Sequence, residues 1–314
     1  MQYFAEAPSN IALIKYMGKQ DHENNTPLNA SLSYTVDELK SYVTIESYSG
    51  AKDAWEPLDM PGVSGFHLSE HAKLRFLEHL ARVKAHFSFE GSLLVRSCNN
   101  FPIATGLASS ASSFAALTIA ACRALSELTN TEMPDTDTMA NMSRLGSGSS
   151  CRSFYKPWAL WDDESIKAIE LPYNELIHHS YLASHDEKTV SSREAHKRVA
   201  TSPHYNGRAD RAHERLATLL QQFRADNWQG AFQTVWDEFQ DMHDLFRTAS
   251  EPFNYITDNT QVLLDIWLDY WEKHGDGPLV TMDAGPNVHL FFRPDQADEA
   301  LRMKQNLLKD YDVI

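Results

Sequence analysis

The segment 99–114, Asn-Asn-Phe-Pro-Ile-Ala-Thr-Gly-Leu-Ala-Ser-Ser-Ala-Ser-Ser-Phe, has the composition of a loop that opens into the first turn of a helix. Gly106 permits a sharp turn, and the small residues after it let a ligand approach the backbone closely. Free N–H groups at a helix start, the positive end of the helix dipole and serine hydroxyls together attract an anion such as a nucleotide phosphate. A tight packing contact would use the same small residues, and the Gly-Lys-Ser/Thr of a P-loop is missing. The residues predicted to bind a nucleotide here are Asn99, Pro102, Gly106, Leu107, Ala108, Ser109 and Ser110.

A second group of residues combines cations with a serine-rich loop. Lys15 and Lys19 are four residues apart, and Gly18 between them favours a strand followed by a turn that brings both amines to one ligand. The loop 146–153, Gly-Ser-Gly-Ser-Ser-Cys-Arg-Ser, contains Arg152, whose guanidinium could hold a carboxylate through two parallel hydrogen bonds. The alternative is that Arg152 is an ordinary solvated surface charge.

Asp283 follows the short apolar run Leu279-Val-Thr-Met282 and precedes Ala-Gly-Pro-Asn. A carboxylate at a strand end beside a sharp turn has a fixed direction, which suits acid–base chemistry. An aspartate that caps its own turn would have the same surroundings. Asn99 and Asn100 leave a similar choice open between contacting a nucleotide and capping a loop.

Composition restricts the partners. The chain has 314 residues, 42% of them hydrophobic, and a formal net charge of −15 with a pI near 5.3. Such a charge disfavours nucleic acid and anionic membranes, so an anionic small ligand would need a local cluster of cations. The N-terminus lacks a signal-peptide pattern, and the longest apolar stretch is too short to span a membrane. These features predict a soluble, cytoplasmic protein.

Cysteine and histidine patterns predict no resident metal. The three cysteines, Cys98, Cys122 and Cys151, fit a reduced cytosol and no metal knuckle, and Cys151 is expected to be packed rather than reactive. The histidines include no His-Glu-x-x-His pair, so zinc chemistry is not expected.

The elements that must position these residues are of mixed type. A length of 314 residues favours two lobes, and strands without strict alternation with helices favour an α+β fold. The lobes are predicted at 1–185 and 186–314, with a packed seam, because long helical patterns replace strands after residue 185. Expected strands are 41–48, 93–95, 165–171, 176–183, 279–282 and 288–292; expected helices are 69–86, 109–129, 135–145, 190–225, 229–249, 258–274 and 295–309.

Six blocks of the sequence, in this order along the chain, resemble the mevalonate diphosphate decarboxylase family of the GHMP small-molecule kinase superfamily. The blocks are Ala7–Lys19, Pro27–Ser33, Pro102–Ala111, Gly146–Ser153, Val190–Ser192 and Met282–Asn287. The resemblance implies a two-lobed GHMP-kinase-like fold with mixed and antiparallel sheets and a cleft between the lobes. It implies ATP-dependent decarboxylation of mevalonate 5-diphosphate, with ATP and Mg²⁺ bound, and a homodimer.

The resemblance also implies roles for single residues. Asp283 would orient or deprotonate the substrate hydroxyl, Lys15 would lie beside the reacting centre, and Arg152 would engage the carboxylate that is lost. Ser110 and Ser149 would lie close to the nucleotide phosphates and magnesium. The implied substrate-binding residues are Tyr16, Met17, Gly18, Lys19, Ser147, Gly148, Ser149, Ser150, Cys151, Arg152, Ser191, Ser192 and Arg193.

The chain departs from the family pattern in several places. Met17 stands where a tryptophan is usual, Phe154-Tyr-Lys-Pro-Trp158 replaces a Gly-Gly pair before an aromatic, and Arg193-Glu-Ala-His196 replaces a threonine followed by Gly-Met. Arg193 could contact phosphate or point to solvent. These changes leave three other activities open: decarboxylation of mevalonate 5-phosphate, phosphorylation of mevalonate at C3, and ligand binding without catalysis.

Overall fold

The computed structural model describes residues 1–61, 63, 68–101, 108–162, 165–184 and 188–314. Three predicted nucleotide-binding residues, Pro102, Gly106 and Leu107, therefore lie outside the described residues.

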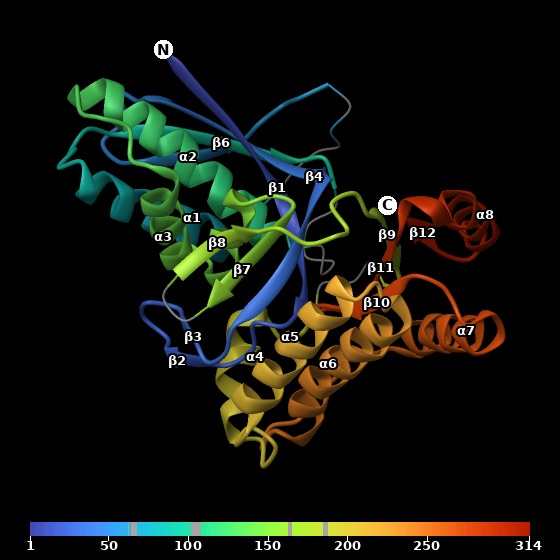
Figure 1. Cartoon of the computed structure of the whole chain (residues 1–314). Helices are drawn as coiled ribbons and strands as arrows, with labels where there is room; N and C mark the ends of the chain where they lie inside the picture. Colours follow the sequence, from blue (N-terminus) through green and yellow to red (C-terminus); the bar gives the residue numbers. More distant parts are fainter. Residues whose placement is uncertain (62, 64–67, 102–107, 163–164, 185–187) are drawn as a thin grey trace.

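The N-terminal part is built on a six-stranded sheet in the order β5-β6-β4-β7-β8, with β1 paired to β4. The two longest strands, β1 (Gln2–Ile14) and β4 (Ser31–Ser47), pair antiparallel along most of their length. Figure 1 shows them running from the upper part of the molecule toward α5 and α6. The other strands are β5 (Ala54–Pro57), β6 (Leu93–Asn99), β7 (Trp158–Asp162) and β8 (Ser165–Ile169), and a separate hairpin is made of β2 (Lys19–Asp21) and β3 (Thr26–Pro27).

Three helices pack beside this sheet: α1 (Glu70–His86), α2 (Ser109–Thr129) and α3 (Thr136–Gly146). Alternate residues of the strands face the helices, so that Val43, Ile45 and Val95 form a buried cluster with Leu80 and Leu117. The 3₁₀ helix η1 (Gly148–Phe154) follows α3 and carries Arg152.

The C-terminal part has a four-stranded antiparallel sheet in the order β10-β11-β9-β12. Its strand β9 (Ile177–Leu182) precedes the predicted boundary at residue 185. The remaining elements are β10 (Leu279–Met282), β11 (Val288–Phe292), β12 (Asp312–Val313), α4 (Ser192–Arg198), η2 (Val199–Thr201), α5 (Arg208–Arg224), α6 (Trp228–Thr248), α7 (Asp258–His274), η3 (Pro294–Gln296) and α8 (Ala297–Leu307).

One large hydrophobic core joins the two parts. Ile11 and Leu32 of the first sheet pack in the same buried cluster as Leu216 of α5, Phe239 of α6 and Phe291 of β11. The seam between the two parts is therefore filled with apolar side chains, which fixes how the residues on either side of it face one another.

Local signals explain where most helices begin and end. Ser69 and Asp135 cap α1 and α3 by accepting hydrogen bonds from backbone N–H groups of the first turn.

The predicted single helical run 190–225 is wrong, because it divides into α4, η2 and α5. Pro203 lacks a backbone donor and Gly207 has a φ of +82°, so the chain turns between them before α5 begins.

Candidate active site

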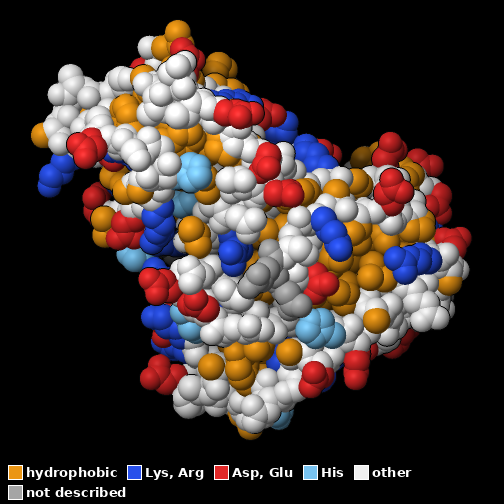
Figure 2. All heavy atoms as spheres, turned by 60° about the vertical axis from the view of Figure 1, so that its left-hand side comes forward, with side chains coloured by type: hydrophobic (Ala, Val, Ile, Leu, Met, Phe, Trp, Pro, Cys, Tyr) orange, Lys and Arg blue, Asp and Glu red, His pale blue; other side chains and the backbone are white. Residues whose placement is uncertain are grey.

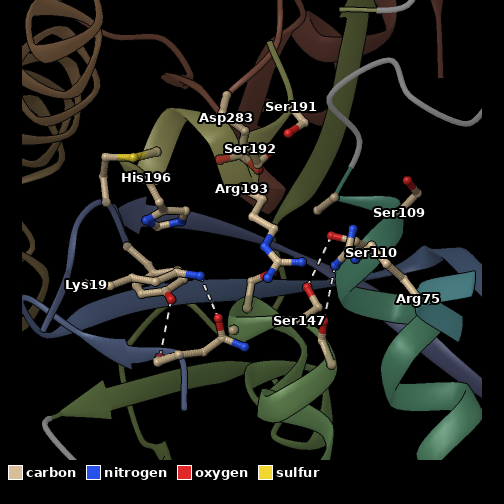
Figure 3. A pocket seen from close by; sticks show the side chains of 18 of the residues that line it. Lys19, Arg75, Ser109, Ser110, Ser147, Ser191, Ser192, Arg193, His196 and Asp283 are labelled. Carbon is tan, nitrogen blue, oxygen red and sulfur yellow. Dashed lines mark hydrogen bonds between the residues drawn. The ribbon is translucent and has the colours of Figure 1, made fainter. Parts of the chain in front are cut away.

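The predicted site residues lie around one cavity of about 560 Å³ between the two parts of the molecule. The N-terminal part contributes the segment after β1, the start of α2 and the loop that leads into η1. The C-terminal part contributes α4 and the turn after β10 (Figure 3). The predicted residues that line the cavity are Lys15, Tyr16, Met17, Lys19, Ala108, Ser109, Ser110, Ser147, Gly148, Ser149, Arg152, Ser191, Ser192, Arg193 and Asp283.

Lys15 and Asp283 form an ion pair across the seam, with 2.8 Å between Lys15 Nζ and Asp283 Oδ1. Both residues line the cavity, and Asp283 is the more accessible of the two, since its side chain is 23% exposed and that of Lys15 is 2% exposed. Burial alone would raise the pKa of Asp283, but Lys15, His289 and Arg152 outweigh it and hold the pKa below its ordinary value. Burial lowers the pKa of Lys15, and Asp283 opposes that shift.

The backbone of Lys15 is held by three side chains. Its N–H donates to Glu238 Oε1 at 2.9 Å, and its carbonyl accepts from Asn29 Nδ2 at 2.9 Å and from Arg208 Nη2 at 3.3 Å. Glu238 and Arg208 form a fully buried ion pair, and Arg208 forms a second ion pair with Asp241. Both peptide groups that flank the Cα of Lys15 are thereby fixed, and this fixes the direction in which the Lys15 side chain extends.

Helix α6 also holds the other member of the pair. His243, five residues after Glu238, donates from Nε2 to the backbone carbonyl of Asp283 at 3.2 Å. A carbonyl oxygen only accepts, so the imidazole proton lies on Nε2. Burial lowers the pKa of His243 to about 3, which keeps the ring neutral at physiological pH. One helix therefore positions both Lys15 and Asp283.

Arg152 is buried at 3% exposure and is held by neutral acceptors. Its Nε donates to Asn10 Oδ1 and Ser33 Oγ, both at 3.1 Å, and its Nη1 donates to Ser31 Oγ at 2.9 Å. Among the described residues, no carboxylate forms an ion pair with Arg152. A buried guanidinium surrounded by neutral groups on the wall of a cavity is suited to an anionic ligand.

Cations are gathered at the other end of the cavity. Burial, followed by the positive charges of Arg193, Arg75 and Lys197, lowers the pKa of Lys19 to about 8. A bound anion would reduce the repulsion between these cations, so their arrangement indicates an anion-binding site. On the face shown in Figure 2, several Lys and Arg side chains lie around the hollow at mid-height. The basic residues that line the cavity are Lys15, Lys19, Arg75, Arg82, Arg152, Lys188 and Arg193, and the acidic residues are Glu23, Glu78 and Asp283.

Arg193 extends into the cavity between His196 on one side and Arg75 and Ser147 on the other (Figure 3). Nearby, Lys188 donates to Ser192 Oγ and to the carbonyl of Ala284, both at 2.9 Å. Burial lowers the pKa of Lys188 to about 8, although Asp283 opposes the shift. The segment 188–193 thus supplies two cations and two hydroxyls to the cavity.

The start of α2 faces the same cavity. Ala108, at the N-cap position, has a φ of 52°, and no side chain of the described residues caps the first turn, whose N–H groups have no partner four residues earlier in the helix. Ser110 accepts a hydrogen bond from Ser147 Oγ at 3.3 Å, which joins this helix start to the serine-rich loop (Figure 3).

Asn99 and Asn100 lie elsewhere. Asn99 is buried, accepts from Ser41 Oγ at 2.7 Å and is not among the residues that line the cavity. Asn100, directly after β6, contacts the middle of β4 by accepting from the N–H of Lys40 and donating to the carbonyl of Glu38, both at 2.8 Å. The loop-capping interpretation therefore fits Asn100.

Three predicted substrate-binding residues support the walls rather than line them. Ser150 donates to the carbonyl of Ser147 at 2.6 Å, and Cys151 is buried with a thiol pKa raised to about 12 by burial. Gly18 has a φ of +96°, and a Cβ there would lie 2.8 Å from Leu28 and 3.0 Å from the Tyr205 ring. The glycine is needed for the turn itself.

Sequence reasoning missed the residues that hold the site in place. Asn10, Ser31 and Ser33 lie within the blocks that resemble the family, and this position was the only feature of the sequence that could have indicated a role in the site. Glu238 and His243 lie on α6 with no motif around them. The other missed residues that line the cavity or brace it are Asn29, Arg75, Lys188, His196 and Arg208.

The described part of the chain contains no group of three or more His, Cys, Asp or Glu side chains that could hold a metal ion. Magnesium needs few protein ligands when phosphates supply the rest, and Ser110 and Ser149 offer hydroxyls on the cavity wall. None of the described helices combines the length and apolar character needed to cross a bilayer.

Comparisons with known proteins place this chain among relatives of similar sequence and fold. A solved mevalonate diphosphate decarboxylase from Legionella pneumophila is 53% identical, with a TM-score of 0.94 and coverage of 100% of both chains. A structure of MDDEF in complex with MVAPP, AMPPCP and magnesium is 29% identical, with a TM-score of 0.86, and covers 100% of this chain and 95% of its own. The diphosphomevalonate decarboxylase of Homo sapiens is 30% identical in an alignment of 324 positions, gaps included, that covers 93% of this chain and 77% of that protein.

Two family models match in sequence order. Residues 7–170 match the diphosphomevalonate decarboxylase-like N-terminal domain, and residues 181–313 match the mevalonate 5-diphosphate decarboxylase C-terminal domain. The chain therefore belongs to the mevalonate diphosphate decarboxylase family.

Proposed function

We propose that this chain catalyses the ATP-dependent decarboxylation of mevalonate 5-diphosphate to isopentenyl diphosphate, ADP, phosphate and CO2. The observation that carries the proposal is the placement of the braced Lys15–Asp283 pair and Arg152 in the same cavity as a separate group of cations. The substrate has the same distribution of groups, with a carboxylate and a hydroxyl at one end and a diphosphate at the other.

Asp283 is the residue proposed to act on the hydroxyl at C3. Its lowered pKa keeps the carboxylate ionised at neutral pH, so it can accept a hydrogen bond or a proton from the hydroxyl. A tertiary hydroxyl is a hindered nucleophile, and fixed orientation toward the γ-phosphoryl group contributes more than the basicity of Asp283. Lys15 holds that orientation through its 2.8 Å contact with the carboxylate.

The reaction then proceeds by loss of the new phosphate group. Transfer of the γ-phosphoryl group to the C3 oxygen converts that oxygen into a leaving group, and its departure with the bonding pair leaves C3 electron-poor. The bond between the carboxylate carbon and C2 breaks, its electron pair forms the new double bond, and CO2 leaves. Arg152, with its Nε and Nη1 held by Asn10, Ser31 and Ser33, is placed to hold the carboxylate until that step.

The nucleotide would bind at the start of α2. The N–H groups of the first turn, the hydroxyls of Ser109 and Ser110, and the linked Ser147 fit the phosphates. Magnesium, when bound with ATP, neutralises charge on the β- and γ-phosphates. Arg75 and Arg193 add positive charge between the nucleotide and substrate phosphates.

A coupled assay tests this function. ADP and CO2 release are measured with mevalonate, its 5-phosphate and its 5-diphosphate as separate substrates. We expect equal amounts of both products with the 5-diphosphate. CO2 from the 5-phosphate alone would assign the other decarboxylase activity, ADP without CO2 would assign a 3-kinase, and binding without either product would assign a silent ligand-binding protein.

The organisation of the molecule is proposed on the same basis. We divide the chain into an N-terminal lobe and a C-terminal lobe, and we place the boundary before Ile177 instead of at residue 185, because β9 pairs within the second sheet. We also infer a cytoplasmic homodimer that binds neither nucleic acid nor membrane, in keeping with the net charge of −15. Light scattering at several protein concentrations tests the dimer.

A further inference from the structure

The segment Tyr16–Lys19 and the helix α4 face each other across the phosphate end of the cavity, and one residue of α4 contacts the segment twice. His196 Nδ1 accepts a hydrogen bond from the backbone N–H of Gly18 at 3.1 Å. The ring of His196 also packs on the ring of Tyr16, with 4.5 Å between centroids. No other described side chain joins α4 to this segment by both a hydrogen bond and a ring contact.

An apolar contact supports the same junction. Met17 is buried in one cluster with Val190, Ala195 and Val199 from around α4 and with Met242 of α6. Gly18 itself has no room for a side chain, because Leu28 and Tyr205 lie against it. Three of the four residues of the segment, Tyr16, Met17 and Gly18, therefore contact α4 or its surroundings, and His196 makes the hydrogen bond among these contacts.

We propose that His196 is a positioning residue that holds the Tyr16–Lys19 segment against α4, so that Lys19 and Arg193 together bind the diphosphate of the substrate. This inference rests on the proposed function of the same cavity. His196 follows Arg193 by three residues, so the two side chains lie on neighbouring positions of one helix face, and Figure 3 shows both beside Lys19.

The chemistry of histidine suits this position. Burial, and after it the positive charge of Arg193, lowers the pKa of Lys19, so a contact that holds these two cations together should add no further positive charge. Burial and the charges of Lys19 and His22 lower the pKa of His196 well below its ordinary value, which keeps the ring neutral. A neutral ring whose Nδ1 accepts from Gly18 carries its proton on Nε2.

Four variants separate the two contacts. His196→Phe keeps an aromatic ring and removes the acceptor, whereas His196→Asn keeps an acceptor at the δ position and removes the ring. His196→Leu is nearly isosteric with His196→Asn and has no acceptor. His179→Phe is the matched control, because His179 is another buried histidine that packs on aromatic rings away from the cavity.

The measurements are kcat, KM for mevalonate 5-diphosphate, KM for ATP, and the calorimetric affinity for inorganic diphosphate. We expect His196→Phe to raise KM for the substrate and weaken diphosphate binding about tenfold, equivalent to about 1.4 kcal/mol. We expect kcat and KM for ATP to stay within about twofold, since Lys15 and Asp283 are held by α6 instead. His196→Asn should recover part of the loss relative to His196→Leu, and His179→Phe should match the wild type.

The design remains decisive if one variant fails. Melting temperatures identify any variant that does not fold, and the isosteric pair His196→Asn and His196→Leu then decides the role of the acceptor. If the wild type binds inorganic diphosphate but does not turn over, the proposed function fails while the His196 comparison still stands. Wild-type diphosphate affinity in folded His196→Phe, or an equal loss in kcat, substrate KM and ATP KM, overturns the proposal.

Discussion

The two ends of the cavity hold their charges in different ways. At the reacting end, Lys15 contacts Asp283, and buried neighbours fix the backbone of both residues. At the phosphate end, Lys19, Arg75 and Arg193 face the cavity together, and their repulsion contributes to the lowered pKa of Lys19. A braced pair can orient reacting atoms before the ligand arrives, whereas a group of mutually repelling cations gains most when an anion binds.

This difference predicts different kinetic consequences for the two ends. Changes at the reacting end should lower kcat, because the geometry there acts during the chemical step. Changes at the phosphate end should raise KM, because the charges there bind the substrate before and during reaction alike. Substitutions at each end of the cavity can therefore test that division.

Replacing Asp283 should give the largest effect. Asp283→Asn and Asp283→Ala are expected to lower kcat at least a few hundredfold, the usual size for removing a positioned acid–base group. Nucleotide affinity should change little, since Asp283 faces the acceptor hydroxyl. Steady-state kinetics and calorimetry with ADP measure both, with Asp265→Asn on α7 as a surface control. If Asp283→Ala kept more than about a tenth of wild-type turnover, the assignment of Asp283 would be wrong.

The substitution Arg152→Lys keeps the positive charge and removes the planar guanidinium with its several hydrogen-bond donors. A lysine cannot reproduce the bonds to Asn10, Ser31 and Ser33 from one planar group, so the buried charge would lose its orientation. We expect kcat/KM for the substrate to fall at least about thirtyfold, with ATP affinity nearly intact. Kinetics with each substrate varied in turn measure this, alongside the melting temperature. Equal losses for ATP and the substrate would place Arg152 on the nucleotide.

The phosphate end should respond to pH. Lys19 and Lys188 have pKa values of about 8, so both are protonated below pH 8 and lose their charge as the pH rises through that value. Affinity for inorganic diphosphate should therefore be highest below pH 8 and fall above it. Lys19→Arg stays charged across this range and should move the fall to higher pH, while Lys167→Arg on the exposed side of β8 should not. A pH-independent affinity between pH 7 and 9.5 would contradict the cluster as the binding site.

The fold was predicted best where the determinants are local. The expected helices 109–129 and 258–274 match α2 and α7, because apolar periodicity and end signals such as Gly275 lie within the segments themselves. The 17-residue strand β4 was predicted only in its second half, 41–48. Its first half owes its conformation to pairing with β1 and β7, which no local pattern reports.

The site shows the same limit. Lys15, Arg152 and Asp283 could be assigned because each lies in a block with a recognisable order of residues. Glu238 and Arg208 could not, because the contacts they make with Lys15 span 223 and 193 residues of sequence. A buried Glu on an amphipathic helix has the same sequence appearance as an exposed one, so the bracing of a site appears only when the tertiary packing is known.

Arg193→Thr should have the smallest effect. It tests whether the phosphate end of the cavity contributes to substrate binding alone or also to the chemical step. Arg193 is an exposed residue that lines the cavity, where it lies near Arg75 and Lys19 without a carboxylate ion-pair partner among the described residues (Figure 3). Threonine restores the usual family residue and removes one charge-assisted contact, so KM for the 5-diphosphate should rise roughly three- to tenfold while kcat changes little. The rise should be smaller for the 5-phosphate, which offers fewer charges to the same cluster.

Lys197→Thr, on the same helix and exposed, is the matched control for the loss of a positive charge at longer range. Unchanged KM values for both substrates and for ATP would leave Arg193 as a solvated side chain, and a fall in kcat would show that the phosphate end also takes part in the chemical step.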